Sequence, residues 1–509
     1  MLKEKLKEYN LNSENIVFYS DDKAKINLKE GNIKGKLVLV TSINPTPFGE
    51  GKTTISIGLT DALCKLGKRA VLSLREPSLG PVFGRKGGAC GGGNSIIEPV
   101  NDINYHFTGD MHAITSANNL ISAAIDNHLY WGNELNIDVS TIVFRRCIDI
   151  NDRTLRNVEI KIDKNTKRIE HFELTAASEL MAILCLSKDI YDLYDRVGEI
   201  YIANDITGNP IYVKDLKCID AVCILLKDAI KPNAVLTKEG NLTLIHGGPF
   251  ANIAHGTSSF IATKTALSLA DIVVTEAGFG SDLGGIKYFD ILSRLGLSPD
   301  LVVLNISVRA LKYNGDGILE KGISNLDFHL ENMSFFSSNI IVVLNRFDDD
   351  TLQDINYIKD YVENKGYNFS ISNSYKYGSS GSIEFAEKVI ELLEYNNKVN
   401  YLYKLDEKLN IKIEKVLKHL GAGKIIYTDK AKAKIKNIED ISYPICIAKT
   451  PMSISDDEKK LGFPKNYEVT VKDIKLCNGA KFVIVYLGNI LTLPGLTKDA
   501  NLYSMKLDM

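Results

Sequence analysis

A run of apolar residues, followed by a Gly-rich turn and an amphipathic segment, constrains this chain more than any other feature. The segment 36–41 contains four consecutive aliphatic residues. Such a run is typical of a strand that is buried on both faces of a parallel sheet. The polar turn 42–51 follows, and apolar residues at helical spacing then predict a helix over 52–66. We therefore expect a strand, a loop and a helix of an α/β fold.

The same kind of segment recurs along the chain. Strand-like runs stand at 70–74, 141–144, 242–245, 271–275, 301–306 and 340–344. Helical patterns stand at 177–186 and at 383–393, the second directly after the Gly/Ser turn 378–382. Alternating strands and helices predict an α/β fold, with a P-loop-type, mostly parallel sheet flanked by helices. The region 406–509 has shorter strands and more turns, which favours a separate, smaller α/β domain there.

Charge and composition exclude several classes of protein. The 509 residues carry 61 basic and 63 acidic side chains, a net charge of −2. A near-neutral chain does not favour a nucleic-acid or membrane partner, and no apolar stretch reaches the ~20 residues of a membrane span. The charged segment 1–9 is not typical of a signal peptide. Eight scattered cysteines without a C-x-x-C pair predict reduced thiols in a cytoplasmic protein.

The turn after the first strand is a variant of the phosphate-binding pattern G-x-x-x-x-G-K-[ST]. Gly51, Lys52 and Thr53 match it, whereas Thr46 stands in place of the first Gly. Glycines let the backbone fold closely around phosphate, and the helix N-terminus adds free N–H groups. Lys52 is placed to reach the β- and γ-phosphates of ATP, and the Thr53 hydroxyl to bind Mg²⁺. The candidate nucleotide-binding residues are Thr46, Pro47, Gly49, Glu50, Gly51, Lys52, Thr53 and Thr54.

Further candidates follow other strands, because loops at the carboxyl ends of parallel strands form the ligand crevice. Arg75 follows the strand 70–74 and suits an oxyanion, and Glu276 ends the strand at 271–275 and could act on Mg²⁺ or be structural. The loop 246–256 is rich in Gly and His and fits either a tight turn or a nucleotide or carboxylate site. Five glycines within 87–93 make a helix or strand improbable and leave a flexible loop, a backbone packed against a ligand, or a closing lid. Lys86 beside them is a candidate phosphate contact.

Two smaller groups of residues leave the assignment open. His106, Asp110 and His112 could suggest a metal, but a carboxylate that organises charge near the phosphate site is the better interpretation. Phe347 and Tyr375 stand in polar loops, where an aromatic ring could stack on a flat ligand. From spacing alone, ordinary packing explains both rings better.

Taken together, the motifs resemble those of the formate–tetrahydrofolate ligases over nearly the whole chain. The segments that carry the resemblance are 45–54, 75–81, 86–93, 102–112, 177–179, 246–256, 275–280, 345–347, 448–450 and 494–496. The resemblance implies an ATP-dependent ligase that joins formate to tetrahydrofolate through formyl phosphate and releases ADP and phosphate. It also implies a homotetramer. Three domains are expected: a nucleotide-binding domain at 1–335, a folate-site domain at 336–405 and a C-terminal domain at 406–509.

The resemblance also implies roles for individual residues. Lys52 stabilises the transferring phosphoryl group, Thr53 helps to hold the nucleotide and Mg²⁺, and Arg75 binds formyl phosphate. Glu76 and Asp110 match positions associated with the site and its activating monovalent cation, K⁺ or NH₄⁺.

Two aromatic residues match the family's folate pocket. Phe347 forms one face, and Tyr375 forms the other, where the family usually has Trp.

The resemblance also implies catalytic roles for Lys52, Arg75 and Asp110. The alternatives are a divergent paralogue with weak or altered activity, a regulatory nucleotide-binding protein, and a ligase with a different acceptor.

Overall fold

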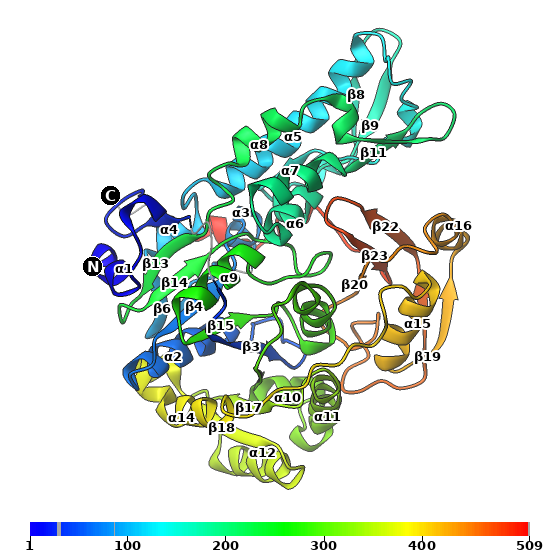
Figure 1. Cartoon of the computed structure of the whole chain (residues 1–509). Coiled ribbons are helices and arrows are strands. Elements are labelled where there is room, and N and C mark those ends of the chain that lie inside the picture. Colours follow the sequence, from blue (N-terminus) through cyan, green and yellow to red (C-terminus); the bar gives the residue numbers. More distant parts are fainter. Residues whose placement is uncertain (28–31, 86, 507–509) are drawn as a thin grey trace.

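The computed structural model describes residues 1–27, 32–85 and 87–506. Within these residues a twelve-stranded sheet forms the centre of the molecule, in the order β1-β2-β13-β14-β4-β15-β3-β16-β17-β18, with β6 beside β13 and β5 beside β6 (Figure 1). Its strands are β1 (Ile16–Phe18), β2 (Ala24–Ile26), β3 (Lys36–Ser42), β4 (Ala70–Leu74), β5 (Gly91–Gly92), β6 (Ser95–Glu98), β13 (Asn233–Thr237), β14 (Leu242–Ile245), β15 (Ile272–Glu276), β16 (Leu301–Ile306), β17 (Ile340–Asn345) and β18 (Asn368–Ser372).

Seven neighbouring strands of this sheet are parallel. From β14 through β4, β15, β3, β16 and β17 to β18, each strand runs parallel to the next. The loops that follow these strands therefore emerge at one edge of the sheet. The predicted class, α/β with a mostly parallel sheet, is confirmed.

Strand β3 shows why a continuous apolar run is needed here. Leu37 and Leu39 pack into the core on one face of the sheet, and Val38 and Val40 pack into the core on the other. Helices α2 (Lys52–Lys65) and α14 (Ile383–Leu392) contribute to the second core, and α9 (Phe260–Leu269) contributes to the first. With both faces covered, the strand is buried from Leu37 to Ser42, and only Lys36 at its start is exposed.

Further helices complete the layers beyond β16. Leu304 and Ile306 pack with residues of α10 (Val308–Asn314), α11 (Leu319–Phe336) and α12 (Leu352–Asn364). The remaining short helices near the sheet are α1 (Leu2–Glu8), α3 (Leu79–Phe83), α4 (Val100–Asn104) and α13 (Ser374–Tyr377). In the described part of the chain, no helix is both long enough and apolar enough to span a membrane.

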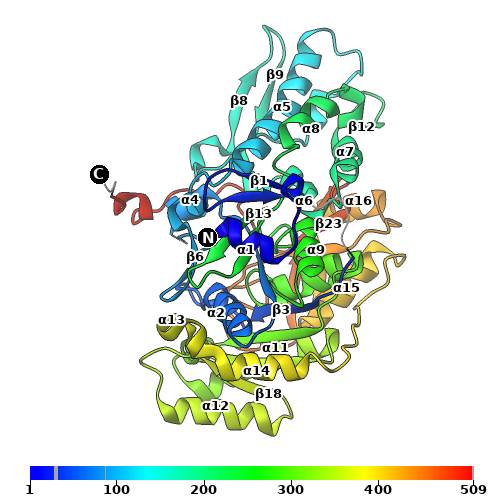
Figure 2. The same ribbon diagram turned by 60° about the vertical axis from the view of Figure 1, so that its left-hand side comes forward.

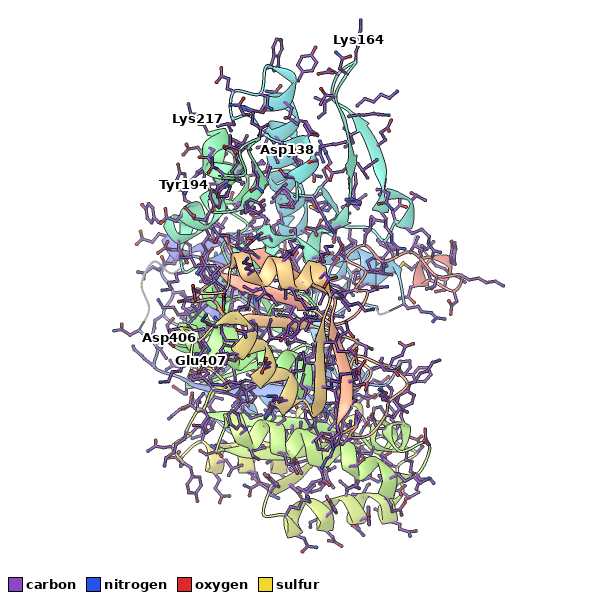
Figure 3. All side chains as sticks on the ribbon, turned by 90° about the vertical axis from the view of Figure 1, so that its right-hand side faces the viewer. Asp138, Lys164, Tyr194, Lys217, Asp406 and Glu407 are labelled. Carbon is purple, nitrogen blue, oxygen red and sulfur yellow. The ribbon has the colours of Figure 1, made fainter. Side chains whose placement is uncertain are left out.

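An arm of helices and small sheets projects from one end of the large sheet (Figures 1 and 2). Figure 3 labels Asp138, Lys164, Tyr194 and Lys217 on this arm. Its elements are α5 (Asp110–Tyr130), α6 (Glu179–Leu186), α7 (Ile190–Gly198), α8 (Ile219–Leu226), β7 (Cys147–Ile148), β8 (Val158–Lys161), β9 (Lys167–Glu170), β10 (Glu173–Leu174), β11 (Tyr201–Asn204) and β12 (Pro210–Tyr212). The arm begins at Asp110, so the start of α5 ties it to the sheet.

The C-terminal segment, residues 406–506, forms its own small sheets beside the large one (Figure 1). Strand β19 pairs with β21, and β20, β23 and β22 form a second sheet. Its elements are α15 (Leu409–His419), α16 (Asp429–Asn437), β19 (Ala422–Tyr427), β20 (Ile445–Ala448), β21 (Tyr467–Val471), β22 (Asp473–Cys477) and β23 (Phe482–Tyr486). The division of the chain at 335 and 405 stays a prediction.

Most predicted elements agree with the structure, and two do not. The strand predicted at 141–144 is wrong: a 3₁₀ turn, Val139–Thr141, is capped by Asp138, and an irregular segment follows. Val143 N donates one backbone hydrogen bond to Ile202 O (2.9 Å) instead of joining a ladder. The Gly-rich segment 87–93 was expected to exclude a strand, yet Gly91 and Gly92 pair with β6. All eight cysteines are free thiols, as predicted.

Candidate functional site

The loop between β3 and α2 curves where its glycines require it. Gly49 and Gly51 have φ of 79° and 69°, in the region that favours glycine. A Cβ on Gly51 would lie 2.4 Å from Asn345 Nδ2. The amides of Asn305 and Asn345, at the ends of β16 and β17, donate to Glu50 O at 2.9 and 3.1 Å. Neighbouring strands therefore hold this loop in place.

The Glu50 carboxylate is used inside the loop. It is buried, and Oε1 accepts a hydrogen bond from the Thr46 backbone N–H (3.0 Å). Oε2 accepts from the Ser307 hydroxyl and lies 3.6 Å from Arg309 Nε. Thr46, the residue in place of the usual first Gly, is thus fixed through its backbone. Glu50 therefore shapes the loop both through its side chain and through its backbone carbonyl.

Lys52 begins α2 and lies across the carboxyl ends of two strands. Its Nζ donates to Phe279 O (2.7 Å) and to Ser42 Oγ (3.0 Å). Burial lowers the pKa of Lys52 to about 8, and the nearby Glu276 carboxylate opposes that shift. The ammonium group is therefore charged at neutral pH and sits at the N-terminus of a helix, where an anion binds.

Thr53 and Glu276 lie together beside Lys52. Thr53 Oγ1 donates to Glu276 Oε2 (3.3 Å), while the buried Oε1 has no hydrogen-bond partner among the described residues. Burial raises the pKa of Glu276, and Lys52 and Arg75 oppose the shift. A hydroxyl beside a carboxylate with a free oxygen is the donor set that Mg²⁺ prefers, so these residues fit that ion.

Arg75 follows β4 and completes a group of charges at this edge of the sheet. Its Nη1 donates to Pro249 O (3.3 Å), and burial lowers its pKa, against the Glu276 carboxylate. His255 lies close by, fully buried, and neither ring nitrogen has a partner in the described structure. Burial, with the charges of Arg75 and Lys287, lowers the pKa of His255 to about 3. The imidazole is therefore neutral and retains one donor and one acceptor for a ligand.

Glu76 and Asp110 form a second, acidic group. Lys25 Nζ lies 2.8 Å from both carboxylate oxygens of Asp110, and Asn233 Nδ2 donates to Oδ2 at 2.8 Å. Glu76 is buried, and its Oε2 has no partner among the described residues. Burial, followed by the charges of Asp110 and Asp149, raises the pKa of Glu76 well above its usual value, and Lys25 opposes the shift.

The histidines flanking Asp110 turn toward each other. His106 Nδ1 and His112 Nε2 are 2.6 Å apart. Outside positions 28–31, 86 and 507–509, no three His, Cys, Asp or Glu side chains are grouped to hold a metal ion. Lys86, proposed as a phosphate contact, lies outside the described residues.

Phe347 and Tyr375 follow the neighbouring parallel strands β17 and β18. The Arg309 guanidinium lies 4.0 Å from the centre of the half-buried Phe347 ring, and the same side chain donates to Gly49 O. Tyr375 belongs to the short helix α13 rather than to a loop, and its side chain is 59% exposed.

The Gly-rich loop packs against Tyr375. A Cβ on Gly92 would lie 3.1 Å from the ring, and a Cβ on Gly93 would lie 2.1 Å from Tyr375 O. Asn94 N also donates to Tyr375 O (2.8 Å). The close approach explains why this segment needs glycine.

Known proteins resemble this chain over nearly its whole length. A sequence model of the family described as formate–tetrahydrofolate ligase matches residues 1–509. This chain belongs to the formate–tetrahydrofolate ligase family. Relatives so named from Campylobacter concisus and Campylobacter curvus are each 48% identical to it, over 98% of this chain and 94% of the relative. One from Caldicellulosiruptor saccharolyticus is 46% identical, over 96% of this chain and 93% of its own length.

The structure of this formate–tetrahydrofolate ligase family member brings several predicted residues together. Lys52, Thr53, Glu276 and Arg75 interact directly or through their charges, whereas Asp110 is paired with Lys25 in the separate group around Glu76. Residue patterns did not single out His255 or the residues that hold the loop in place. The Gly/His-rich loop 246–256 was the only signal for His255. Nothing local marks Asn305 or Arg309, and Asn345 stood out only as part of the segment 345–347 that carries the family resemblance.

Proposed function

We propose that this protein is an ATP-dependent ligase that joins formate to tetrahydrofolate, giving 10-formyltetrahydrofolate, ADP and phosphate. The full-length match to the family carries the proposal. The chemistry of the loops at the carboxyl edge of the parallel strands supports it. These loops bring together a lysine at a helix N-terminus, an arginine, a neutral histidine and a carboxylate with a free oxygen.

In the first step, a formate oxygen attacks the γ-phosphorus of ATP. The bond between that phosphorus and the bridging oxygen breaks, and formyl phosphate and ADP form. Formate alone is a poor electrophile because attack would add electron density to an anion, and phosphorylation supplies a leaving group. Lys52, charged below about pH 8, offsets the charge on the transferring group.

Residues of the phosphate loop hold the nucleotide. Backbone N–H groups of the loop and the α2 N-terminus face the phosphates. Thr53 and Glu276 would hold Mg²⁺, which would supply positive charge to offset that of the phosphates. The nucleotide contacts are made by Thr46, Pro47, Gly49, Glu50, Gly51, Lys52, Thr53 and Thr54.

In the second step, the N10 amine of tetrahydrofolate attacks the formyl carbon, the bond from that carbon to the phosphate oxygen breaks, and the amine releases its proton as phosphate leaves. The Arg75 guanidinium binds two oxygens of formyl phosphate and offsets the charge on the departing phosphate. His255 donates an N–H to the same group, since its low pKa keeps the ring neutral. Phe347 and Tyr375 cover the two faces of the pterin.

The acidic group around Glu76 has a separate role. The unpartnered Glu76 oxygen would contribute to a site for an activating monovalent cation, K⁺ or NH₄⁺, and Asp110 would take part in catalysis beside it. We also propose that the protein is a cytoplasmic homotetramer without nucleic-acid or membrane partners. Its domains are a nucleotide-binding domain at 1–335, a folate-site domain at 336–405 and a C-terminal domain at 406–509.

Release of ADP tests the proposal. ADP is measured with ATP and Mg²⁺ in the presence of formate, of tetrahydrofolate, of both and of neither. Turnover that needs both substrates and yields 10-formyltetrahydrofolate supports the ligase. ATP binding without turnover under any of these conditions would reject it in favour of a regulatory nucleotide-binding protein, and turnover with another amine acceptor would redefine the substrate.

A further inference from the structure

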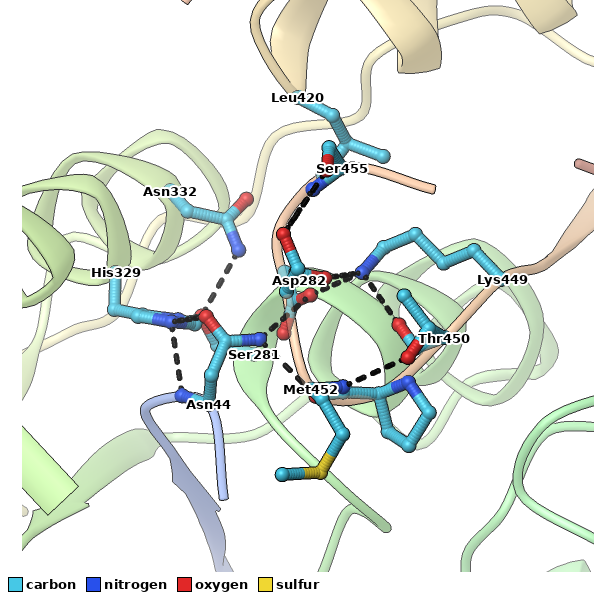
Figure 4. A network of polar contacts seen from close by, with 12 residues as sticks. Asn44, Ser281, Asp282, His329, Asn332, Leu420, Lys449, Thr450, Met452 and Ser455 are labelled. Carbon is cyan, nitrogen blue, oxygen red and sulfur yellow. Dashed lines mark hydrogen bonds and ion pairs between the residues drawn. The ribbon is translucent and has the colours of Figure 1, made fainter. Parts of the chain in front are cut away.

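Lys449 of the C-terminal segment is buried directly beside the start of the phosphate loop (Figure 4). Its side chain is 0% exposed, as is that of its partner Asp282. Lys449 Nζ donates to Asp282 Oδ2 (2.5 Å), to Ser453 O (2.5 Å) and to Thr450 O (3.2 Å). All three donors of the ammonium group are used within the protein, so Lys449 has no donor left for a substrate.

Asp282 connects Lys449 to the phosphate loop. The same oxygen, Oδ2, accepts a hydrogen bond from Asn44 Nδ2 (3.1 Å), and Asn44 Nδ2 also donates to Pro451 O (3.2 Å). Asn44 lies between β3 and the glycines of the loop. Two residues of the C-terminal segment, one through Asp282 and one directly, thus hold the residue at which the loop begins.

The other side of Asn44 is held by α11. The Asn44 backbone N–H donates to His329 Nε2 (3.1 Å), and the Asn44 side-chain oxygen accepts a hydrogen bond from Asn325 Nδ2 (2.8 Å). His329 and Asn332 also interact with Ser281, the residue next to Asp282 (Figure 4). Asn44 is therefore fixed by three segments that are distant in the sequence.

Asp282 also lies close to the group that holds the catalytic lysine. The π-helical turn Ser281–Gly285 begins two residues after Phe279, whose carbonyl oxygen accepts from Lys52 Nζ at 2.7 Å. Phe279 has a φ of 60°, which is uncommon for a residue with a side chain. Tethering Asp282 to Lys449 thus restrains both the start of the loop and the segment that positions the Lys52 ammonium group.

We infer that Lys449 is a positioning residue, which acts through Asp282 on Asn44 and on the Phe279 carbonyl to hold the phosphate loop in its nucleotide-binding geometry. The inference rests on the proposed function for the identity of the nucleotide. A buried ion pair is weak support for a stabilising role, because desolvation offsets much of the attraction. The ion pair instead links the C-terminal segment to the phosphate loop, which indicates that it positions the loop.

The chain offers a matched control in Lys412. This lysine is also 0% exposed and belongs to the same C-terminal segment. Its Nζ donates to three carbonyl oxygens, those of Leu405 (3.0 Å), Ile441 (2.6 Å) and Tyr443 (2.9 Å). None of these partners belongs to the phosphate loop or to the turn that contains Asp282. Lys412→Met therefore removes a buried lysine without removing a contact to the site.

The test compares Lys449→Met with Lys412→Met by thermal unfolding, by calorimetric titration with ATP, and by the KM for tetrahydrofolate. Both variants should lower Tm. Lys449→Met should weaken ATP binding about tenfold or more while the KM for tetrahydrofolate stays within about twofold, and Lys412→Met should change neither. Equal ATP affinity in wild type and Lys449→Met would overturn the inference, as would equal weakening by both variants.

Two further variants keep the test decisive where Lys449→Met does not fold. The double variant Lys449→Met/Asp282→Asn leaves no unpaired buried charge. The single variant Asn44→Ala leaves the ion pair between Lys449 and Asp282 intact. Each variant should weaken ATP binding, and normal ATP affinity in both would overturn the inference.

If wild type binds ATP but does not use formate, the proposed function fails while the ATP titrations still decide the role of Lys449. Absence of ATP binding by wild type would overturn both.

Discussion

The carboxyl edge of the large sheet and the C-terminal segment each contain a lysine of lowered pKa. Burial lowers the pKa to about 8 for both Lys52 and Lys412. Lys412 donates to three carbonyl oxygens, whereas Lys52 shares its surroundings with the charges of Glu276 and Arg75. A shifted pKa alone therefore does not identify a functional lysine. What distinguishes Lys52 is its place at the N-terminus of α2, beside the Thr53 hydroxyl and a Glu276 oxygen that has no partner in the described residues.

The largest expected effect comes from replacing each of these two lysines in turn. Lys52→Ala should lower kcat about 10²–10³-fold, because a charge that offsets the transition state is lost. It should lower Tm less than Lys412→Met does, because it removes the donor to one carbonyl oxygen rather than to three. Lys412→Met should lower Tm because it leaves carbonyl oxygens unsatisfied, at a cost of about 1–3 kcal/mol each, but keep kcat per folded molecule. Steady-state kinetics and thermal unfolding of both variants measure this. Near-normal kcat for Lys52→Ala would contradict the proposed role of the loop.

Arg75 separates binding of ATP from the chemistry that follows. Arg75→Ala should lower kcat about 10²-fold and leave ATP affinity within a few-fold, because formyl phosphate exists only after the first transfer. Arg75→Lys should recover part of the loss, since a point charge cannot replace the planar guanidinium. ATP titration beside steady-state kinetics provides the measurement. Parallel loss of ATP affinity and kcat would assign Arg75 to the nucleotide site instead.

Tyr375 tests the folate end of the same edge. Tyr375→Ala should raise the KM for tetrahydrofolate about tenfold, since an aromatic contact worth about 0.5–1.5 kcal/mol and some apolar area are lost. The KM for ATP should not change. Tyr375→Trp, which restores the residue usual in the family, should lower the KM for tetrahydrofolate. An unchanged KM for tetrahydrofolate in both variants would exclude Tyr375 from the pocket.

The smallest expected effect concerns pH. Protonated Lys52 binds phosphate, and its lowered pKa of about 8 means that the charge is present below that pH and is lost as the pH rises through it. kcat/KM for ATP reports the free enzyme and should therefore fall to about half its plateau near pH 8. In Lys52→Arg, which stays charged, residual activity should lack this alkaline decline. The same decline in Lys52→Arg would assign it to another group.

Local sequence determined most of the elements that frame the site. Apolar runs placed β3, β4, β14, β15, β16 and β17. The spacing of apolar residues placed α2 and α14, because these patterns reflect which faces a segment must bury. Gly51, Lys52 and Thr53 predicted a phosphate loop from residue types alone. The resemblance to the family added the substrates, and the comparisons establish the family itself.

Tertiary structure decided what local patterns could not express. The segment 141–144 is apolar enough for a strand, but it makes one backbone bond to the arm and joins no ladder. Asn305, Asn345 and Asn44 are ordinary polar residues in the sequence, and only the order of the parallel strands brings two of them to Glu50 and the third to Asp282. Hydrogen bonds between such distant residues depend on which strands become neighbours, and that is set by burial of the whole sheet rather than by any single segment.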